Sequence, residues 1–182
     1  DQSATEDQAF SFQFATNTFA DVDVGDTLTY SATLANGDPL PTWLTFNPAT
    51  RTFSGTPANG DVGSITVRIT ATDGSNATAS DDFAITVANV NDAPTVANAI
   101  PDQSATEDQA FSFQFASNAF ADVDVGDTLT YSATLANGDP LPTWLTFNAA
   151  TRTFSGTPAN GDVGQITVRV TATDGSSAAV SD

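Results

Sequence analysis

Acidic side chains are the residues of this 182-residue chain whose types and spacing could do chemistry. They gather in short groups: Glu6-Asp7, Asp21-Val-Asp23-Val-Gly-Asp26, Asp61 and Asp73, followed by Asn89, Asn91 and Asp92, and then Glu107-Asp108, Asp122, Asp124, Asp127, Asp162 and Asp174. Two carboxylates about 4 Å apart repel each other by about 1 kcal/mol even in bulk water. A hard cation relieves this repulsion, and Ca²⁺ accepts about six to eight oxygen ligands in flexible geometry. The pattern therefore predicts calcium sites, with a solvated acidic surface as the alternative.

The segment 21–26 begins like the calcium loop of an EF-hand but departs from that motif. Its fifth position is Gly25, and its twelfth is Ala32 instead of the bidentate glutamate that such a loop requires. The sequence also contains no Gly-rich nonapeptide calcium repeat. We therefore expect the ends of strands, gathered at one pole of a fold, to position the carboxylates.

Apolar and polar residues alternate between the acidic groups. Val, Ile, Thr and Phe recur with a period of two, which is typical of β-strands with one buried face. The expected strands of the first half are 10–14, 28–34, 43–46, 51–53, 65–71 and 83–87, with a further one at 2–5. Arg68 and Arg169 fall on outward faces, where a cation discourages pairing at a sheet edge. The pattern predicts an all-β chain of seven-stranded Greek-key β-sandwiches.

The chain repeats itself at an offset of 101 residues. Residues 1–81 and 102–182 are identical at 73 of 81 aligned positions. A period of this length indicates whole domains in series, so we expect one domain at 1–90, a short stiff linker with two prolines at 91–101, and a second domain at 102–182. The second domain lacks a counterpart of 82–90, the last strand of the first. Either its end frays, or a neighbouring chain supplies the strand.

Composition excludes several classes of function. The net charge is −18, and all four cations are arginines, so nucleic acid and anionic membrane surfaces are not expected partners. Cys, His and Met are absent, which removes thiolate zinc sites, disulfides and the usual general base. No apolar run approaches the ~20 residues that span a bilayer, so membrane insertion is not expected.

Several motifs resemble one family. They are Phe19-Ala-Asp-Val-Asp-Val-Gly-Asp-Thr-Leu-Thr-Tyr30, Leu40-Pro-Thr-Trp-Leu-Thr-Phe46, Thr52-Phe-Ser-Gly-Thr-Pro57, Ile69-Thr-Ala-Thr-Asp73 and Val87-Ala-Asn-Val-Asn-Asp-Ala-Pro94. In this order they resemble the dystroglycan-type cadherin-like domain and the related immunoglobulin-like tandem repeats of bacterial secreted or surface proteins. The resemblance covers essentially the whole chain and implies a cadherin/immunoglobulin-like fold.

The resemblance also implies calcium at the junction between the two domains. The implied ligands are Glu6, Asp61, Asn89, Asn91, Asp92, Asp122, Asp124, Asp127 and Asp174, with Asp21, Asp23, Asp26 and Asp73 as a weaker set at the N-terminal pole. The lower-pole Asp-Arg-Glu motif of vertebrate cadherins is absent, since residues 58–62 read Ala-Asn-Gly-Asp-Val. One or two ions at the junction are therefore expected instead of three.

These features together favour a calcium-stiffened structural extender in a large adhesin, extracellular or on a bacterial cell surface, for cell adhesion or matrix attachment as in a biofilm. Its partners would be further copies of the repeat in series. The alternative is a module that binds polysaccharide or protein, such as a like domain. Trp43 and Trp144 could stack on sugars, but their alternating surroundings predict core positions. An enzyme is not expected, because each repeat has one Glu and its Asp residues cluster at the poles.

Overall fold

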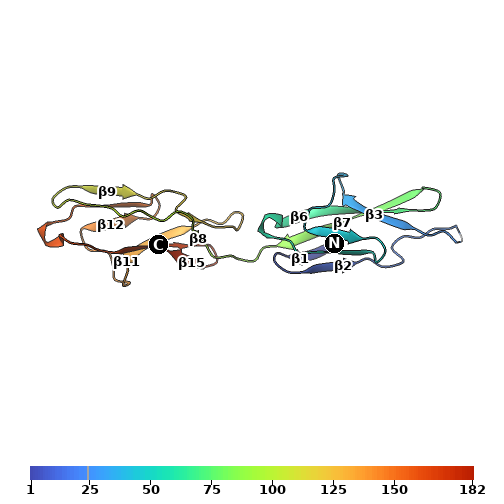
Figure 1. The fold of residues 1–182 in the computed structure, drawn as a ribbon, viewed down its shortest axis with the longest axis horizontal. Coiled ribbons are helices and arrows are strands. Elements are labelled where there is room, and N and C mark those ends of the chain that lie inside the picture. The colour runs from blue at the N-terminus through green and yellow to red at the C-terminus, as the bar shows by residue number, and fades with distance from the viewer. Residues whose placement is uncertain (24) are drawn as a thin grey trace. The chain divides into compact units, whose positions relative to one another are not determined.

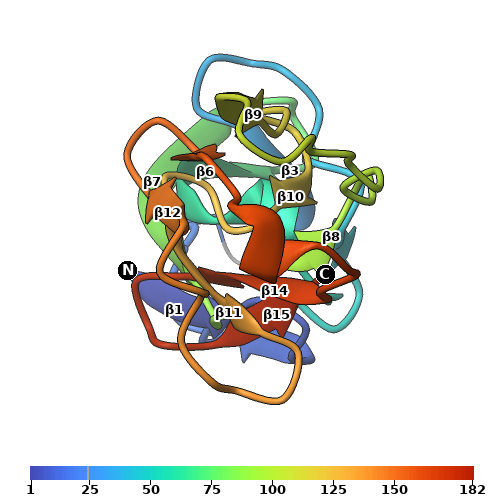
Figure 2. The same cartoon turned by 90° about the vertical axis from the view of Figure 1, so that its left-hand side faces the viewer.

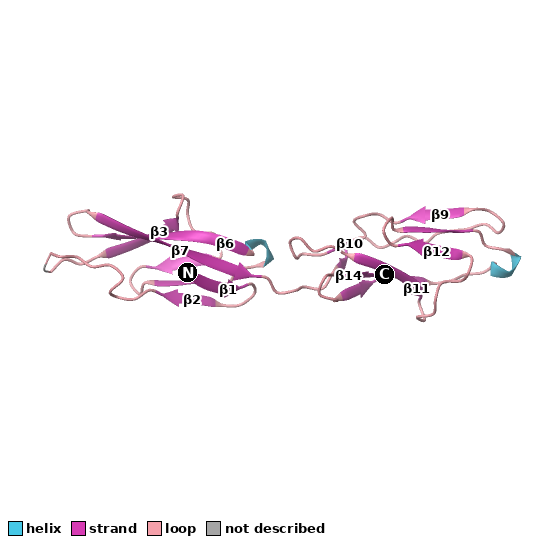
Figure 3. Ribbon diagram, turned by 180° about the vertical axis from the view of Figure 1, so that it is seen from behind, coloured by secondary structure: helices cyan, strands magenta, loops and turns pink. Residues whose placement is uncertain are grey.

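The computed structural model describes residues 1–23 and 25–182. The chain divides into two compact units, Asp1–Val90 and Asn91–Asp182. Strands and loops make up almost all of both units, and two single-turn 3₁₀ helices, η1 at Asn59–Asp61 and η2 at Asn160–Asp162, complete the secondary structure (Figure 3). No helix among the described residues is long and apolar enough to cross a bilayer.

Unit 1 is a sandwich of two sheets. The first sheet has the order β1 (Gln2–Thr5), β7 (Thr78–Ala88), β6 (Gly63–Thr72) and β3 (Thr29–Leu34), and the second has the order β2 (Phe10–Gln13), β5 (Thr52–Gly55) and β4 (Leu44–Asn47). β1 pairs with β7 in parallel, and the other neighbours are antiparallel. Each strand predicted from the period-two pattern is present, including the one at 2–5 (Figure 1).

Alternate side chains of the two sheets meet in the core of unit 1. Phe53 on β5, Val67 on β6 and Ile85 on β7 each have no exposed surface. Aromatic rings join the layers, since Phe53 and Phe83 from opposite sheets lie 5.5 Å apart between centroids. Trp43 is half-buried against this core, with its ring edge-on to that of Phe10. The expectation that Trp43 is a core residue is thus confirmed.

Unit 2 has a similar sandwich, but one of its sheets has three strands, which are also shorter on average, where unit 1 has four. That sheet has the order β11 (Thr130–Leu135), β14 (Val168–Thr173) and β15 (Ala179–Ser181), and the facing one has the order β12 (Leu145–Asn148), β13 (Thr153–Gly156) and β9 (Phe111–Gln114). β11, β14 and β15 form one layer in the view along the unit (Figure 2). The predicted all-β fold class is confirmed.

Two features of the structure differ from the sequence-based expectations. Residues 91–101 belong to unit 2, where β8 (Thr95–Val96) pairs with β10 (Phe120–Ala121) in a two-stranded ribbon that the alternation did not predict. The suggestion that Arg68 protects a sheet edge is wrong for unit 1, because β6 lies between β7 and β3. Arg68 instead forms an ion pair with Asp82 on β7, through two hydrogen bonds of 2.8 Å.

Candidate metal centres

Three carboxylates of unit 2 meet at one pole of its sandwich. One side-chain oxygen from each of Asp122, Asp127 and Asp174 lies within 4.8 Å of the others. Asp122 and Asp127 come from the loop that follows β10, and Asp174 directly follows β14. Strand ends therefore bring together residues about fifty positions apart in sequence, as the pattern predicted.

The loop 122–127 folds with its acids inward and its valines outward. Asp124 is only 6% exposed, whereas Val123 is 53% and Val125 is 83% exposed. The Asp124 N–H donates to Asp122 Oδ1 at 3.0 Å, which is the side-chain-to-backbone turn that Asp favours two residues before the donor. Gly126 supplies a positive φ of 97° that closes the loop. This arrangement reverses the usual preference for burying valine rather than aspartate.

Asp174 is held in a turn of its own. Its Oδ1 accepts the N–H groups of Ser176 and Ala178 at 2.9 and 2.8 Å, and its Oδ2 accepts the Asn91 side-chain amide at 2.9 Å. The Asn91 hydrogen bond is the main cause that holds the pKa of Asp174 below its ordinary value, and the backbone N–H groups add to it, while burial opposes them. Asp174 is therefore a fixed, ionised carboxylate.

Residues 91 and 92 lie against this pole. Besides bonding to Asp174, the Asn91 amide donates to the Asp92 carbonyl at 3.0 Å. The Asp92 N–H donates to Asp124 Oδ2 at 2.9 Å. The Asn-Asp pair identified from the sequence thus contacts the two most buried carboxylates of the unit, Asp124 and Asp174.

Two buried oxygens of this cluster have no hydrogen-bond donor among the described residues. They are Asp122 Oδ2 and Asp124 Oδ1. An unpaired buried polar group costs about 1–3 kcal/mol, and more when it is charged. A hard cation satisfies such oxygens, and Ca²⁺ takes carboxylate and carbonyl oxygens without a strict geometry. The donor set of the pole, which is all oxygen, therefore fits Ca²⁺.

Unit 1 has an equivalent acidic loop, but the middle aspartate of that loop is exposed. Asp21, Asp26 and Asp73 also offer oxygens within 4.8 Å of one another. The Asp23 N–H donates to Asp21 Oδ1 at 2.9 Å, and Asp73 Oδ1 accepts the N–H groups of Ser75 and Ala77, so the local turns match those of unit 2. Asp23 is exposed, however, whereas its counterpart Asp124 is buried.

Glu6 lies at the opposite pole of unit 1. Its side chain is completely buried, and its Oε1 accepts the Val90 N–H, while its own N–H donates to the Ala88 carbonyl at 3.1 Å. Glu6 Oε2 has no hydrogen-bond partner among the described residues. Asn89, the residue before Val90, is exposed. Glu6 therefore ties the start of unit 1 to its last residue.

Asp61 has a local role in the structure. Its Oδ2 accepts the Ala58 N–H at 3.0 Å, which caps η1. Asp162 makes the same bond to Ala159 in unit 2. Neither residue belongs to a three-carboxylate group within the described part of the chain. The backbone N–H groups that hold Asp174 were not predicted, although the turn-forming run Asp-Gly-Ser at 174–176 is a sequence signal for them.

Residues 1–88 and 93–182 each match the family model described as "Putative Ig domain". The chain belongs to this family and contains two of its domains. It is similar to the "Serine-rich adhesin for platelets" of Staphylococcus aureus strain MRSA252, at 33% identity over 137 residues that cover 75% of this chain and 9% of that protein. The same adhesin of strain USA300 matches at 33% identity, over 75% of this chain and 5% of its own length. The chain thus spans less than a tenth of these curated relatives.

Solved cadherins have a similar fold. Mouse Cadherin-23 EC22-24 aligns with a TM-score of 0.59 and 20% identity over 85% of this chain and 50% of that one. The human Desmocollin-1 ectodomain aligns with a TM-score of 0.59 and 15% identity over 98% of this chain and 36% of its own. At such identities the likeness establishes the cadherin-like fold alone.

Proposed function

We propose that this chain is a calcium-stiffened structural extender in a large secreted or cell-surface adhesin. Modules in series hold a distal binding domain away from the cell, and calcium at their poles limits the motion between them. Membership of an immunoglobulin-like family, the similarity to a staphylococcal adhesin and the tandem repeat support the extender role. The same similarity supports a location outside the cell, on a bacterial surface, and a module without enzymatic activity.

The observation that carries the calcium proposal is the pole of unit 2. Asp122 and Asp124 each bury an oxygen that no donor satisfies in the described chain, beside the ionised Asp174. Burying carboxylates while exposing Val123 and Val125 costs free energy unless a cation compensates it. This free-energy cost, which no donor in the described chain offsets, is the physical argument for an ion at the pole of unit 2.

The junction between the units is where we propose that calcium stiffens the chain. Glu6 binds the N–H of Val90, and Asn91, joined to Val90 by one peptide bond, binds Asp174. A trans peptide separates consecutive Cα atoms by about 3.8 Å, so little free chain connects these anchored residues. The proposed ligands are Glu6, Asp61, Asn89, Asn91, Asp92, Asp122, Asp124, Asp127 and Asp174, with a weaker site at Asp21, Asp23, Asp26 and Asp73.

Titration calorimetry of the native chain tests the proposal. We expect saturable Ca²⁺ binding with a Kd of about 10⁻⁴–10⁻³ M, as for extracellular modules. At ten times a Kd of about 1 mM, binding adds about 1.4 kcal/mol of stability, which a chelator removes. Mg²⁺ at equal concentration should stabilise less, because it demands near-octahedral geometry.

Matched variants separate a site from general acidity. Asp124→Asn removes a buried ligand charge, and we expect at least a ten-fold weaker Kd, about 1.4 kcal/mol. Asp139→Asn makes the same charge change at an exposed turn, where Asn137 binds the side chain. Asp139→Asn should bind Ca²⁺ like the native chain. Equal weakening by both variants, or identical melting in calcium and in chelator, would contradict the proposal.

A further inference from the structure

The first and last strands of unit 1 lie side by side. β1 pairs with β7 in parallel, with Gln2 opposite Ile85 and Thr5 opposite Ala88 (Figure 1). The other neighbouring strands of unit 1 are antiparallel. Parallel strands begin at the same end of their ladder, so the start of β1 and the end of β7 lie at its opposite ends.

This arrangement decides how tension along the chain acts on the sandwich. The chain runs into unit 1 through β1 and leaves it after β7, at the Val90–Asn91 bond. Tension therefore pulls the two strands in opposite directions along their lengths, and the hydrogen bonds of the ladder resist it together. In an antiparallel pair joined by a turn, the free ends lie side by side, and tension breaks the ladder bonds one after another.

Acidic side chains extend the ladder at both of its ends. Asp1 Oδ1 accepts the Ala84 N–H at 3.0 Å, beside the start of β1. At the other end the Glu6 N–H donates to the Ala88 carbonyl at 3.1 Å, and Glu6 Oε1 accepts the Val90 N–H. Hydrogen bonds to a carboxylate are about twice as strong as those between neutral groups. Charged acceptors thus reinforce the two positions at which tension reaches the strand pair.

The end of the ladder at Glu6 is closed to water. The Glu6 side chain has no exposed surface. A hydrogen bond in such low-dielectric surroundings is electrostatically stronger than one in water. The bond between Glu6 and Val90 therefore holds the point at which β7 passes into the rest of the chain.

Core packing opposes sliding of β1 along β7. Ala4 of β1 and both Ile85 and Val87 of β7 belong to the core, and none is more than 5% exposed. A slip of one residue would turn the buried face of a strand outward, because side chains alternate between faces. β7 also pairs with β6 over ten residues, whereas β1 pairs over four with β7. β1 is therefore the strand that yields first under tension.

We propose that Asp1, Glu6 and the β1–β7 pair form a mechanical clamp through which unit 1 bears tension along the chain. The clamp combines a ladder loaded in shear, charged acceptors at both ends and a core that opposes slipping. Bearing tension is a further function, distinct from the calcium-dependent stiffening proposed above, because none of these bonds involves a metal ion. Its test is made in chelator, so that either proposal can fail without the other.

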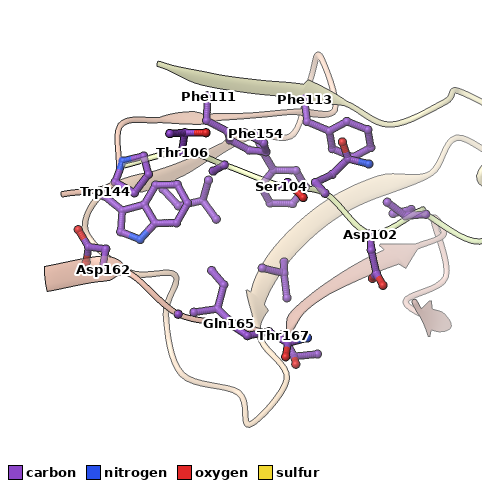
Figure 4. A pocket seen from close by; sticks show the side chains of 18 of the residues that line it. Asp102, Ser104, Thr106, Phe111, Phe113, Trp144, Phe154, Asp162, Gln165 and Thr167 are labelled. Carbon is purple, nitrogen blue, oxygen red and sulfur yellow. The ribbon is translucent and has the colours of Figure 1, made fainter. Parts of the chain in front are cut away.

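The clamp is described and tested in unit 1. In unit 2 the counterpart of β7 begins with β15 and extends to Asp182, the last residue of the sequence. A cavity of about 770 Å³ lies next to Asp182, with Phe111, Phe113 and Trp144 in its wall (Figure 4). Unit 2 therefore remains outside the pulled segment in the experiments below.

Single-molecule pulling of the full chain tests the clamp, since forced unfolding reports the unfolding barrier instead of the equilibrium stability. The sequence has no cysteine, so introduced cysteines define where force is applied. A cysteine added before Asp1 and Ala93→Cys load β1 and β7 in shear. Ser3→Cys and Thr86→Cys, at exposed positions opposite each other in the ladder, peel the strands apart.

We expect unit 1 to unfold at a force about two-fold higher or more in shear than in peeling, because the ladder bonds break together in shear and in sequence in peeling. The length of chain released identifies unit 1 in each trace. A shear force equal to or below the peeling force would overturn the proposal.

Variants at the two ends of the ladder test the carboxylates. Asp1→Ala and Glu6→Ala each remove one charged acceptor, and each should lower the shear force by about a quarter or more while changing the peeling force less than half as much. Asp1 is exposed, so Asp1→Ala keeps the test valid if Glu6→Ala does not fold. Thr29→Ala is the control, since it removes a 3.2 Å hydrogen bond between β3 and β6, away from β1.

Thr29→Ala should leave the shear force unchanged. A shear force that Asp1→Ala does not lower would show that the carboxylates do not reinforce the clamp and would overturn the proposal. A loss of the same proportion in shear and in peeling would overturn it as well, because that result reports general destabilisation of unit 1.

Discussion

The acidic loops show how single residues are positioned by local and by tertiary forces. The hydrogen bond that the Asp124 N–H donates to Asp122 Oδ1 recurs from the Asp23 N–H to Asp21 Oδ1, because it depends only on neighbouring residues. The burial of Asp124 does not recur at Asp23. Contacts with Asn91 and Asp92 distinguish the unit 2 pole. The local turn presents the carboxylates, and the packing around them decides which of them are buried.

Arg68 and Asp82 predict a pH dependence at the residue scale. The hydrogen bonds from Arg68 are the main cause that lowers the pKa of Asp82 from its ordinary 3.8. A carboxylate whose pKa is lowered by folding stabilises the fold above its unfolded pKa, and this contribution is lost as pH falls through the lower, folded pKa. Arg68→Gln should therefore destabilise unit 1 at neutral pH and have little effect in strong acid.

Chemical denaturation of unit 1 at several pH values, followed by resolved NMR signals, measures this difference. Arg169→Gln is the matched control, since Arg169 has no ion pair in the described chain. We expect its effect on unit 2 to be small and independent of pH. An Arg68→Gln effect that persists unchanged below the folded pKa of Asp82 would show that the ion pair is not its cause.

At the scale of the element, one glycine lets β5 pass close to the chain before β4. A Cβ built on Gly55 would lie 1.7 Å from the Trp43 carbonyl oxygen, and the same holds for Gly156 and Trp144. Backbone approach this close admits only glycine. The Phe-Ser-Gly run at 53–55, quoted in the family resemblance, thus has a steric reason within the sandwich.

Gly55→Ala is expected to destabilise unit 1 by about 3 kcal/mol or more, because a backbone carbonyl cannot move aside as a flexible side chain can. The measurement is the free energy of unfolding of unit 1 in urea. Gly60→Ala is the matched control, since a Cβ there meets nothing within 4 Å. Similar losses from both substitutions would mean that general effects of removing glycine outweigh the clash.

Sequence periodicity predicted the strands of unit 1 well, and it failed in identifiable places. Apolar and polar residues alternate over four or more positions in β2, β4, β5 and β6. The sequence therefore predicts which face of each strand is buried. The ribbon of β8 and β10 has two residues in each strand, too few for a period. The segment 164–167 has nearly the same sequence as the start of β6 but forms no ladder, since pairing requires a partner strand.

The whole molecule should respond to calcium by becoming stiffer. Inter-domain interfaces that are small and polar leave relative motion as the default. An ion bound by residues on both sides of the Val90–Asn91 bond would remove part of this freedom. The absence of cysteine from the sequence allows one spin label in each unit, through Ser31→Cys and Ser132→Cys at equivalent exposed positions.

Electron paramagnetic resonance then measures the distribution of distances between the labels. We expect calcium to narrow this distribution at least two-fold in width and chelator to broaden it again. Asp124→Asn should require more calcium for the same narrowing, whereas Asp139→Asn should not. If calcium binds but the width of the distance distribution does not change, the bound ions do not stiffen the chain. That result would contradict the extender mechanism.

The sequence by itself determined the all-β class, the domain repeat, most strands and every carboxylate of the two poles, because period-two alternation and short turns are local properties of the chain. Only the tertiary structure decided which carboxylates are buried without donors in the described chain. Asp23 and Asp124 have the same neighbours in sequence, yet Asp23 is exposed and Asp124 is buried. Burial and pairing depend on residues distant in the chain, so near-identical sequences reach different environments.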